Sequence, residues 1–321
     1  MNKFKLAIKK SNEKYNNTFN LTDFRRDGLL FILFVLVIPM ISCFLLFAVF
    51  NNFKAFSTDQ KNISSINIMI QLFSPLIGIY IFYIRQKEIF YKEGFFMFLF
   101  YSIMPIVLSI CLMMFAAEKS NDSITTSNYK NSAQILGQAI YEFIFILVAF
   151  KQIKSIREIF IETFKKSWKL ILITTFFGVL LTLFSTFIVN LIHSSQSVNQ
   201  ESLTRGLKSA ASPSKTLLII SLFLFTVLVA PLFEEIICRH LINMFVSNQT
   251  WGFIFSALFF AAIHIMQSGD FENILSYLAP AIVLTAFFSL SGGNIAYSWP
   301  IHSIYNMVVL IIEITNPGGT K

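Results

Sequence analysis

The chain has 321 residues, of which 55% are hydrophobic and 13% are charged, and 38 of them are phenylalanines. A water-soluble protein of this length cannot bury so much apolar surface in one core, so the composition excludes that class and favours a protein of the lipid bilayer. The formal net charge of +8 is concentrated in loops beside apolar segments, which argues against a nucleic-acid partner and for orientation of the chain in a membrane.

Apolar segments long enough to cross a hydrocarbon core of about 30 Å recur along the whole chain. A basic segment, residues 1–27, precedes the first of them and does not resemble a cleavable signal peptide, so the first span is expected to stay in the protein. We predict an all-α, polytopic bundle of about eight or nine transmembrane helices, with spans near 28–50, 66–84, 95–116, 134–150, 169–193, 215–247, 251–267, 275–290 and 299–315.

Two basic regions set the expected orientation. Residues 1–27 and the connection 151–169 are rich in lysine and arginine, so both are predicted to lie on the cytoplasmic side of the cell membrane. Within that connection, residues 153–166 are typical of an amphipathic helix on the membrane surface, with an apolar side formed by Ile153, Ile156, Ile159 and Phe160.

Polar side chains recur every four residues in the fourth predicted span, at Gln134, Gln138 and Glu142. Such a stripe must face protein or water and not lipid. We expect Gln138 and Glu142 either to line a substrate cavity or to form a hydrogen-bonded seam between helices.

A polar stretch then separates the two halves of the chain. Residues 194–214 are rich in serine, asparagine and glutamine and contain Pro213, so they are predicted to form a mobile external loop. This loop would divide an N-terminal transmembrane bundle, residues 28–193, from a C-terminal one, residues 215–315.

The segment Glu234-Glu235-Ile-Ile-Cys-Arg239 places three charges inside a predicted span, where charges are rare and need partners or water. Glu235 and Arg239 are four residues apart and share a helical face, whereas Glu234 points about 100° away. We therefore predict a Glu235–Arg239 ion pair, a Glu234 that faces a water-filled cavity, and a helix kink near Pro231. The alternative is a charge cluster at a helix end.

The next span carries His264, and a polar turn around Ser247–Thr250 separates it from the glutamates. Glu234 lies about 14 residues before the middle of this turn and His264 about 15 after it, so both are roughly 22 Å from the turn in an antiparallel hairpin. A lone histidine in an apolar span is more often a packing residue, but the equal depth predicts that these two side chains meet.

The last span contains His302 and Asn306, four residues apart on one helical face. Both side chains can donate hydrogen bonds to a developing oxyanion, although a polar seam between helices would show the same spacing. Together the three spans supply a base, an orienting group and oxyanion donors, an inventory that suits amide hydrolysis by activated water.

Three motifs occur in the order EExxxR, FxxxH and HxxxN, and they resemble those of the CAAX prenyl protease and bacteriocin-processing (CPBP, Abi-type) family of intramembrane proteases. The resemblance covers roughly residues 215–315, which would form the catalytic core. It implies that Glu235 and Arg239 support the site, and the motifs begin at Glu234, Phe260 and His302.

The same resemblance implies that Glu234 and His264 activate a water molecule while His302 and Asn306 stabilise the oxyanion. No cofactor is expected, because Asn306 is a poor zinc ligand and a good oxyanion donor. A zinc site formed by Glu234, His264 and His302 stays the alternative.

The function implied is that of an intramembrane endopeptidase, with the membrane lipid and a peptide or lipid-anchored protein as its partners. The bias toward lysine, asparagine, isoleucine and phenylalanine is typical of a bacterial chain, which favours bacteriocin or peptide maturation or self-immunity over a prenylated substrate. Two other classes compete with this hypothesis: a non-catalytic membrane scaffold or immunity protein, and an ion-coupled transporter, for which the inverted repeats are missing.

Overall fold

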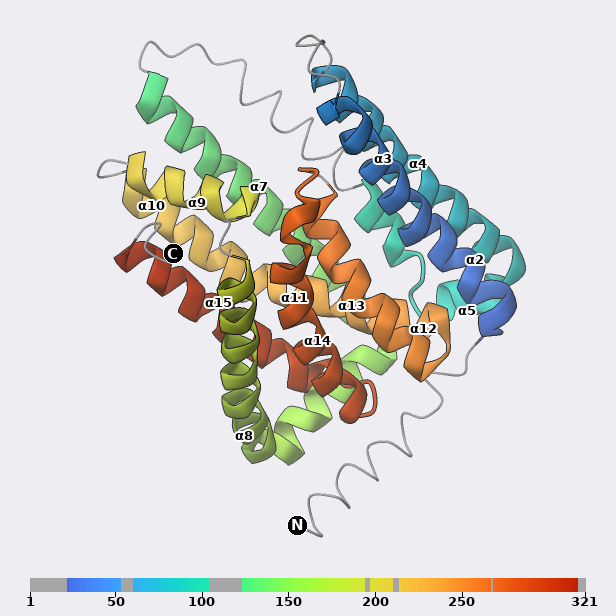
Figure 1. Cartoon of the computed structure of the whole chain (residues 1–321). Helices are drawn as coiled ribbons and strands as arrows, with labels where there is room; N and C mark the ends of the chain where they lie inside the picture. Colours follow the sequence, from blue (N-terminus) through green and yellow to red (C-terminus); the bar gives the residue numbers. More distant parts are fainter. Residues whose placement is uncertain are drawn as a thin grey trace.

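The computed structural model describes residues 22–52, 60–103, 123–193, 197–209, 214–266 and 268–316, and all regular structure in these ranges is helical. Figure 1 shows the helices gathered into one bundle. Seven segments are long and apolar enough to cross a membrane: Phe24–Ala48, Ile66–Arg85, Asn131–Gln152, Lys154–Ile192, Ser214–Val246, Phe271–Leu290 and Ile295–Thr315. The predicted polytopic helical bundle is therefore confirmed.

The predicted count of eight or nine spans is not confirmed, for two reasons. Helix α13, Gln249–Ile265, is apolar but has only 17 residues and does not qualify as a full crossing by length. The predicted span 95–116 lies largely outside the described residues, which resume at Ser123.

The N-terminal half begins with a continuous helical run in which two π-helical turns, Phe24–Gly28 and Leu33–Val37, alternate with α2 (Leu29–Ile32) and α3 (Ile38–Asn52). Figure 1 shows this run beside α4, Gln60–Arg85, against which it packs. The short α5, Lys87–Lys92, and the long α7, Ser123–Gln152, follow.

A buried carboxylate joins the first helical run to the end of α4. Asp27 accepts hydrogen bonds from Arg85 Nε at 2.5 Å and from Gln86 Nε2 at 2.8 Å, and its side chain is 3% exposed. Arg85 and Gln86 lie at the end of α4, so these hydrogen bonds fix the position of α4 along the first helical run.

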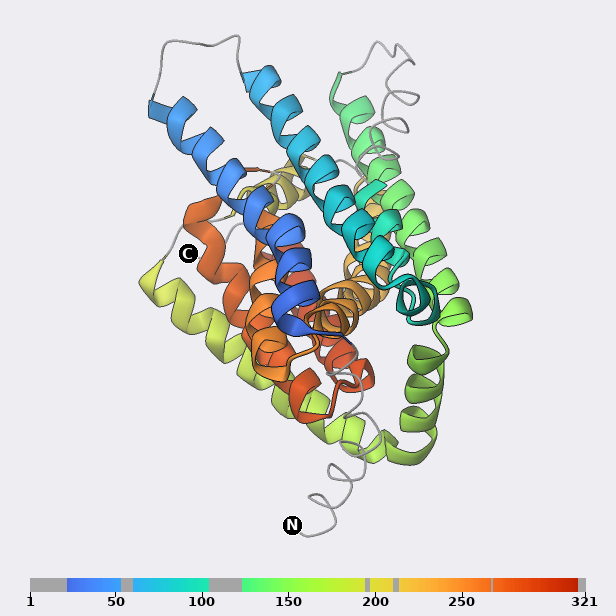
Figure 2. The same cartoon turned by 90° about the vertical axis from the view of Figure 1, so that its right-hand side faces the viewer.

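Helix α8, Lys154–Ile192, bends at Ser167, whose backbone torsions of −131° and 21° are not helical. Figure 2 shows the two arms of α8 meeting at a sharp angle. The first arm is the predicted amphipathic helix, and Ile153, Ile156 and Ile159 on its apolar side are buried against the protein. Its position on the cytoplasmic surface stays a prediction.

The prediction of a loop over residues 194–214 is wrong for Val198–Ser209, which form helix α9. The side chains of Thr204 and Leu207 are buried, and Gln200 and Thr204 donate hydrogen bonds to the buried Glu313. The polar composition of this segment indicated a loop, because the acceptor for its polar side chains, Glu313, lies more than 100 residues away in the sequence.

The segment Ser214–Val246 alternates between α-helix and π-helix. Its parts are α10 (Ser214–Leu222), the π-helical η4 (Phe223–Val229), α11 (Ala230–Glu234), the π-helical η5 (Glu235–Leu241) and α12 (Ile242–Val246). Pro231 is the second residue of the short α11, and π-helical turns lie on both sides of this helix. The kink near Pro231 stays a prediction.

Two tight turns complete the C-terminal half. Ser247, at a φ of 50°, ends α12, and Asn248 caps α13 by accepting from Trp251 N at 3.0 Å. Gly292 and Gly293, at φ of 76° and 85°, connect α14 (Ile274–Leu290) to α15 (Ile295–Thr315). The predicted antiparallel hairpin of α12 and α13 is observed.

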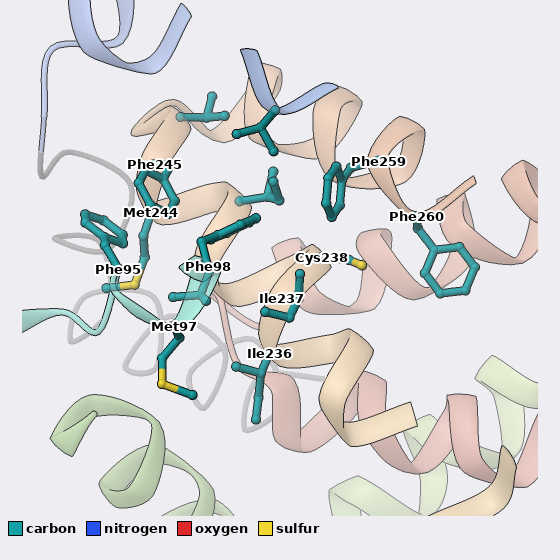
Figure 3. Close-up of a cluster of buried hydrophobic side chains, with 14 of the residues drawn as sticks. Phe95, Met97, Phe98, Ile236, Ile237, Cys238, Met244, Phe245, Phe259 and Phe260 are labelled. Atoms are coloured by element: carbon teal, nitrogen blue, oxygen red, sulfur yellow. The ribbon is translucent and has the colours of Figure 1, made fainter. Parts of the chain in front are cut away.

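The main core is an aromatic cluster shared by both halves of the chain (Figure 3). Phe245 of α12 stacks on Phe31 with ring centroids 3.6 Å apart and on Phe95 at 3.8 Å. Ile236 and Ile237 are fully buried in the same cluster. The helix that carries the glutamates is thereby anchored on the N-terminal helices, while the division of the chain into two transmembrane units stays a prediction.

Candidate active site

The structure brings Glu234, His264 and His302 together from α11, α13 and α15. His264 Nε2 lies 3.8 Å from Glu234 Oε1, and His302 Nε2 lies 3.5 Å from Glu234 Oε2. The equal depth predicted for Glu234 and His264 is observed, and His302 joins them from the last helix.

Both imidazole rings direct the same nitrogen at Glu234. His264 Nδ1 lies 2.8 Å from the carbonyl oxygen of Phe260, which can only accept, so this nitrogen carries the hydrogen. His302 Nδ1 lies 3.2 Å from Glu235 Oε1 and donates in the same way. Each neutral ring therefore presents the lone pair of Nε2 to the Glu234 carboxyl group, an arrangement that calls for a shared proton or water.

The predicted Glu235–Arg239 pair is present, with Arg239 Nη1 3.4 Å from Glu235 Oε1 and both side chains fully buried. Glu235 is bonded on its other oxygen as well, because Ser298 Oγ donates to Oε2 at 2.5 Å. With Arg239, His302 and Ser298 around it, the Glu235 carboxylate is occupied and serves to orient its neighbours.

Phe260 lies at the centre of these groups. Its ring centroid is 4.7 Å from that of His264 and 5.5 Å from that of His302, and the Arg239 guanidinium carbon lies 4.3 Å above it. The ring thus packs both histidines and holds the guanidinium by a cation–π contact. This is a physical reason for phenylalanine at the first position of the FxxxH motif.

Asn306 is held by the backbone of the neighbouring segment η4. Its Nδ2 donates to the carbonyl oxygen of Thr226 at 2.9 Å. Thr226 lies in the π-helical η4, where the wider turn alters the pairing of backbone carbonyls. One amide N–H of Asn306 is used in this bond, and the second remains for an oxyanion.

The exposure of the side chains separates two sets of residues. Glu234 and His264 are 16% and 23% exposed, whereas His302 is 4% exposed and Glu235 and Arg239 are fully buried. Glu234 and His264 therefore lie closer to the surface of the protein than the groups behind them.

The polar stripe of α7 divides along its length. Gln134 is exposed, Gln138 is half-buried and donates to Glu142 Oε1 at 3.0 Å, and Glu142 itself is buried. Glu142 Oε2 has no hydrogen-bond partner within the described ranges. Helix α7 packs against α11, with the ring centroids of Phe145 and Phe233 4.7 Å apart, so the inner end of the stripe faces the glutamate helix.

Among the described residues, no group of three histidine, cysteine or acidic side chains is arranged to hold a metal ion. Glu234, His264 and His302 as placed are not such a group, and the zinc site stays a prediction.

Two contacts of the site were missed in the sequence. Ser298 lies four residues before His302, so the polar stripe of His302 and Asn306 extends one turn further. The same four-residue spacing could have predicted this contact. Tyr277 of α14 stacks on His264 with ring centroids 4.7 Å apart, and no pattern in the sequence marks it.

A comparison with known families gives one match. Residues 216–308 match the family model described as Rce1-like, type II CAAX prenyl endopeptidase Rce1-like. This segment is similar to that family. The matched range contains Glu234, His264, His302 and Asn306, and it confirms the resemblance predicted from the motifs. It indicates a CAAX-type endopeptidase within a multi-pass membrane protein.

The chain is also similar to two other proteins. A protein of Mycoplasma capricolum subsp. capricolum described as uncharacterized is 29% identical over 320 residues, which cover 95% of this chain and 91% of the relative. The UPF0177 protein YbdI of Lactococcus lactis subsp. lactis is 29% identical over 92 residues, 29% of this chain and 49% of that protein. No solved structure matches the chain.

Proposed function

We propose that the protein is an intramembrane endopeptidase that hydrolyses a peptide bond with a water molecule activated by Glu234. The observation that carries this proposal is the convergence of two imidazole Nε2 atoms on the Glu234 carboxyl group, at 3.8 and 3.5 Å. Each ring is held by a partner on Nδ1, so the convergence is built by the surrounding helices. The Rce1-like match supports the endopeptidase class.

The separation between His264 and Glu234 suits a bridging water. At 3.8 Å, Nε2 and Oε1 are too far apart for a direct hydrogen bond, and a water beside them reaches both. Glu234 accepts a proton from this water while its oxygen attacks the carbonyl carbon of the substrate, and His264 Nε2 orients the second O–H.

The tetrahedral intermediate carries a negative oxygen that needs donors. His302 Nε2 and the second amide N–H of Asn306 are the groups proposed for this role. Because His302 Nδ1 donates to Glu235, His302 must be doubly protonated when it also donates from Nε2. The proton that Glu234 takes from the water passes to His302 Nε2, which lies 3.5 Å from Glu234 Oε2, and supplies this second hydrogen. Collapse of the intermediate breaks the C–N bond, and the same proton returns through Glu234 to the leaving amine.

The proposed substrate is a peptide or a lipid-anchored protein segment that reaches the site within the membrane. Bacteriocin or peptide maturation and self-immunity are the contexts that the family resemblance suggests. The family description names prenylated CAAX substrates, so prenylated and unprenylated versions of one peptide are the informative pair.

The test is cleavage of lipidated, prenylated and unmodified hydrophobic peptides by protein purified in detergent. We expect Glu234→Gln, which keeps the shape of the side chain and removes the base, to lower kcat by at least about 100-fold. Glu88→Gln, a change at an exposed glutamate of α5, is the matched control and should cleave as the native protein does.

Three outcomes contradict the proposal. Cleavage that persists in Glu234→Gln would rule out the assigned base, and loss of cleavage on addition of a chelator would favour the metal alternative. A cellular phenotype that survives both Glu234→Gln and His264→Ala would favour the non-catalytic scaffold.

A further inference from the structure

Tyr277 connects the candidate active site to helix α9. Its ring stacks on that of His264, with centroids 4.7 Å apart and an angle of 28° between the planes. Its hydroxyl donates to Ser197 Oγ at 3.0 Å, and Ser197 immediately precedes α9 and is 7% exposed. One side chain therefore contacts both a proposed catalytic histidine and the start of a helix that the sequence did not predict.

The contact with Tyr277 restrains the direction of His264 Nε2. The bond from Nδ1 to the Phe260 carbonyl fixes one point of the imidazole ring but leaves its plane able to tilt. Phe260 packs against the ring from the same helix, at a centroid distance of 4.7 Å. Tyr277 packs against it from α14, so the plane is set by two helices and Nε2 stays directed at Glu234.

Helix α9 has a second anchor on the helix that carries His302. Gln200 Nε2 and Thr204 Oγ1 donate to the two oxygens of Glu313, at 2.8 and 3.0 Å. Glu313 and His302 are 11 residues apart on α15, about three turns, so they share a face roughly 16 Å apart along the axis. Figure 1 shows α9 beside α10.

The two anchors make α9 a support for Tyr277. Because α9 is held on α15 through Glu313, Ser197 at its start is fixed relative to His302, and the bond from Tyr277 to Ser197 carries that restraint to His264. Ser197 Oγ also accepts from Gln200 N at 3.3 Å, which orients the hydroxyl.

We propose that Tyr277 is a positioning residue for His264, held in place by its hydrogen bond to Ser197 at the start of α9. This inference rests on the proposed function, because it assigns Tyr277 a part in the same hydrolysis. Tyr277 itself takes no proton and forms no bond with the substrate.

The kinetic test uses three variants beside the native protein. Tyr277→Phe and Ser197→Ala each remove the tether and keep the ring, and we expect each to lower kcat about three- to tenfold with KM unchanged. The double variant should have the same kcat as either single variant, because both substitutions remove the same hydrogen bond between Tyr277 and Ser197. Tyr277→Leu, which removes the stacked ring, should lower kcat about 100-fold.

A matched control is Tyr80→Phe, which removes the hydroxyl of an exposed tyrosine on α4. It deletes a tyrosine hydroxyl of the same helical bundle on a helix that carries no residue of the candidate site, so kcat should stay within about twofold of the native value. In a His264→Ala background, Tyr277→Leu should cause no further loss, whereas a general structural role would lower the residual rate again.

A second measurement needs no substrate. The chain has four histidines, so ring resonances of histidine-labelled protein can be assigned by single substitutions. Tyr277→Leu should shift the ring signals of His264 and leave those of His193 in place. Unchanged His264 signals, or an unchanged kcat in Tyr277→Leu, would overturn the inference while the proposed function stands, since that function is tested separately by cleavage in Glu234→Gln and in the presence of a chelator.

Discussion

Two adjacent carboxylates in one helix have opposite surroundings, and this difference assigns their roles. Glu235 is fully buried and bonded to Arg239, His302 and Ser298. Glu234, the next residue, is 16% exposed and lies against the Nε2 atoms of two histidines. A buried, saturated carboxylate is a poor base, whereas one that water reaches and that faces two lone pairs is suited to accept a proton.

Glu142 lies outside the three motifs, and we expect it to contact the substrate. Its Oε2 is buried and has no hydrogen-bond partner among the described residues, and its helix α7 packs against α11, which carries Glu234. A group in this condition can bind a backbone N–H of the substrate. Gln138, one helical turn earlier, donates a hydrogen bond to the other carboxylate oxygen, Oε1.

We expect Glu142→Gln to raise KM for peptide cleavage about tenfold, because a hydrogen bond to a charged acceptor is worth about 1.5–3 kcal/mol and an amide replaces it only in part. Steady-state kinetics measure the change. Gln134→Ala, at the exposed outer end of the same stripe, serves as control. Unaltered cleavage by Glu142→Gln would leave Gln138 and Glu142 as a plain interhelical seam.

At the level of single elements, the π-helical turns around α11 are the main departure from regular helix. The turn over Phe223–Val229 offers the Thr226 carbonyl to Asn306, and the turn over Glu235–Leu241 carries both Glu235 and Arg239. Wider turns of this kind often accompany functional sites, because they change which side chains and carbonyls share a face. Periodicity in the sequence assumes 3.6 residues per turn and does not reveal them.

Helix α9 depends on Glu313, and its stability can be tested apart from catalysis. Glu313→Leu removes the acceptor of Gln200 and Thr204, which should cost about 1–3 kcal/mol of local stability. We expect amide hydrogen exchange in residues 198–209 to become about tenfold faster or more.

The control for this experiment is Glu201→Gln, which breaks an exposed ion pair with Arg205 on the same helix. Exposed pairs contribute only about 0–1 kcal/mol, so exchange should change little. Equal exchange rates in Glu313→Leu and the native protein would show that α9 is held by other contacts.

Across the whole molecule, the N-terminal helices position the helices of the site. The carbonyl oxygen of Met266, two residues after His264, accepts from Asn67 Nδ2 at 2.8 Å and Gln71 Nε2 at 3.1 Å, both on α4. Together with the aromatic cluster around Phe245, these bonds attach α12 and α13 to a bundle that contributes no motif.

Phe245→Ala should therefore weaken the entire fold. Phe245 is fully buried and stacked between Phe31 and Phe95, and removal of such a ring costs about 3–5 kcal/mol. Thermal unfolding in detergent should show a clearly lower midpoint. Phe176→Ala, at a side chain that is 62% exposed on α8, is the control and should leave the midpoint nearly unchanged. Equal midpoints would contradict a central role for the cluster.

The sequence by itself determined the features that depend on neighbours along the chain. Composition required a membrane protein, and the i, i+4 spacing predicted the pairing of Glu235 with Arg239. Counting residues from one turn predicted that Glu234 meets His264. Each of these follows from the length of a segment or the rise of a helix, quantities that distant residues do not alter.

Only the tertiary structure decided which groups surround these residues. The bonds of Glu235 to Ser298 and His302, and of Asn306 to Thr226, join helices more than 60 residues apart in sequence. The same holds for α9, whose polar face is satisfied by Glu313, and for the ring of Tyr277 on His264. Such contacts arise from the packing of whole helices, and in a membrane that packing depends on side-chain fit and hydrogen bonds that no local pattern records.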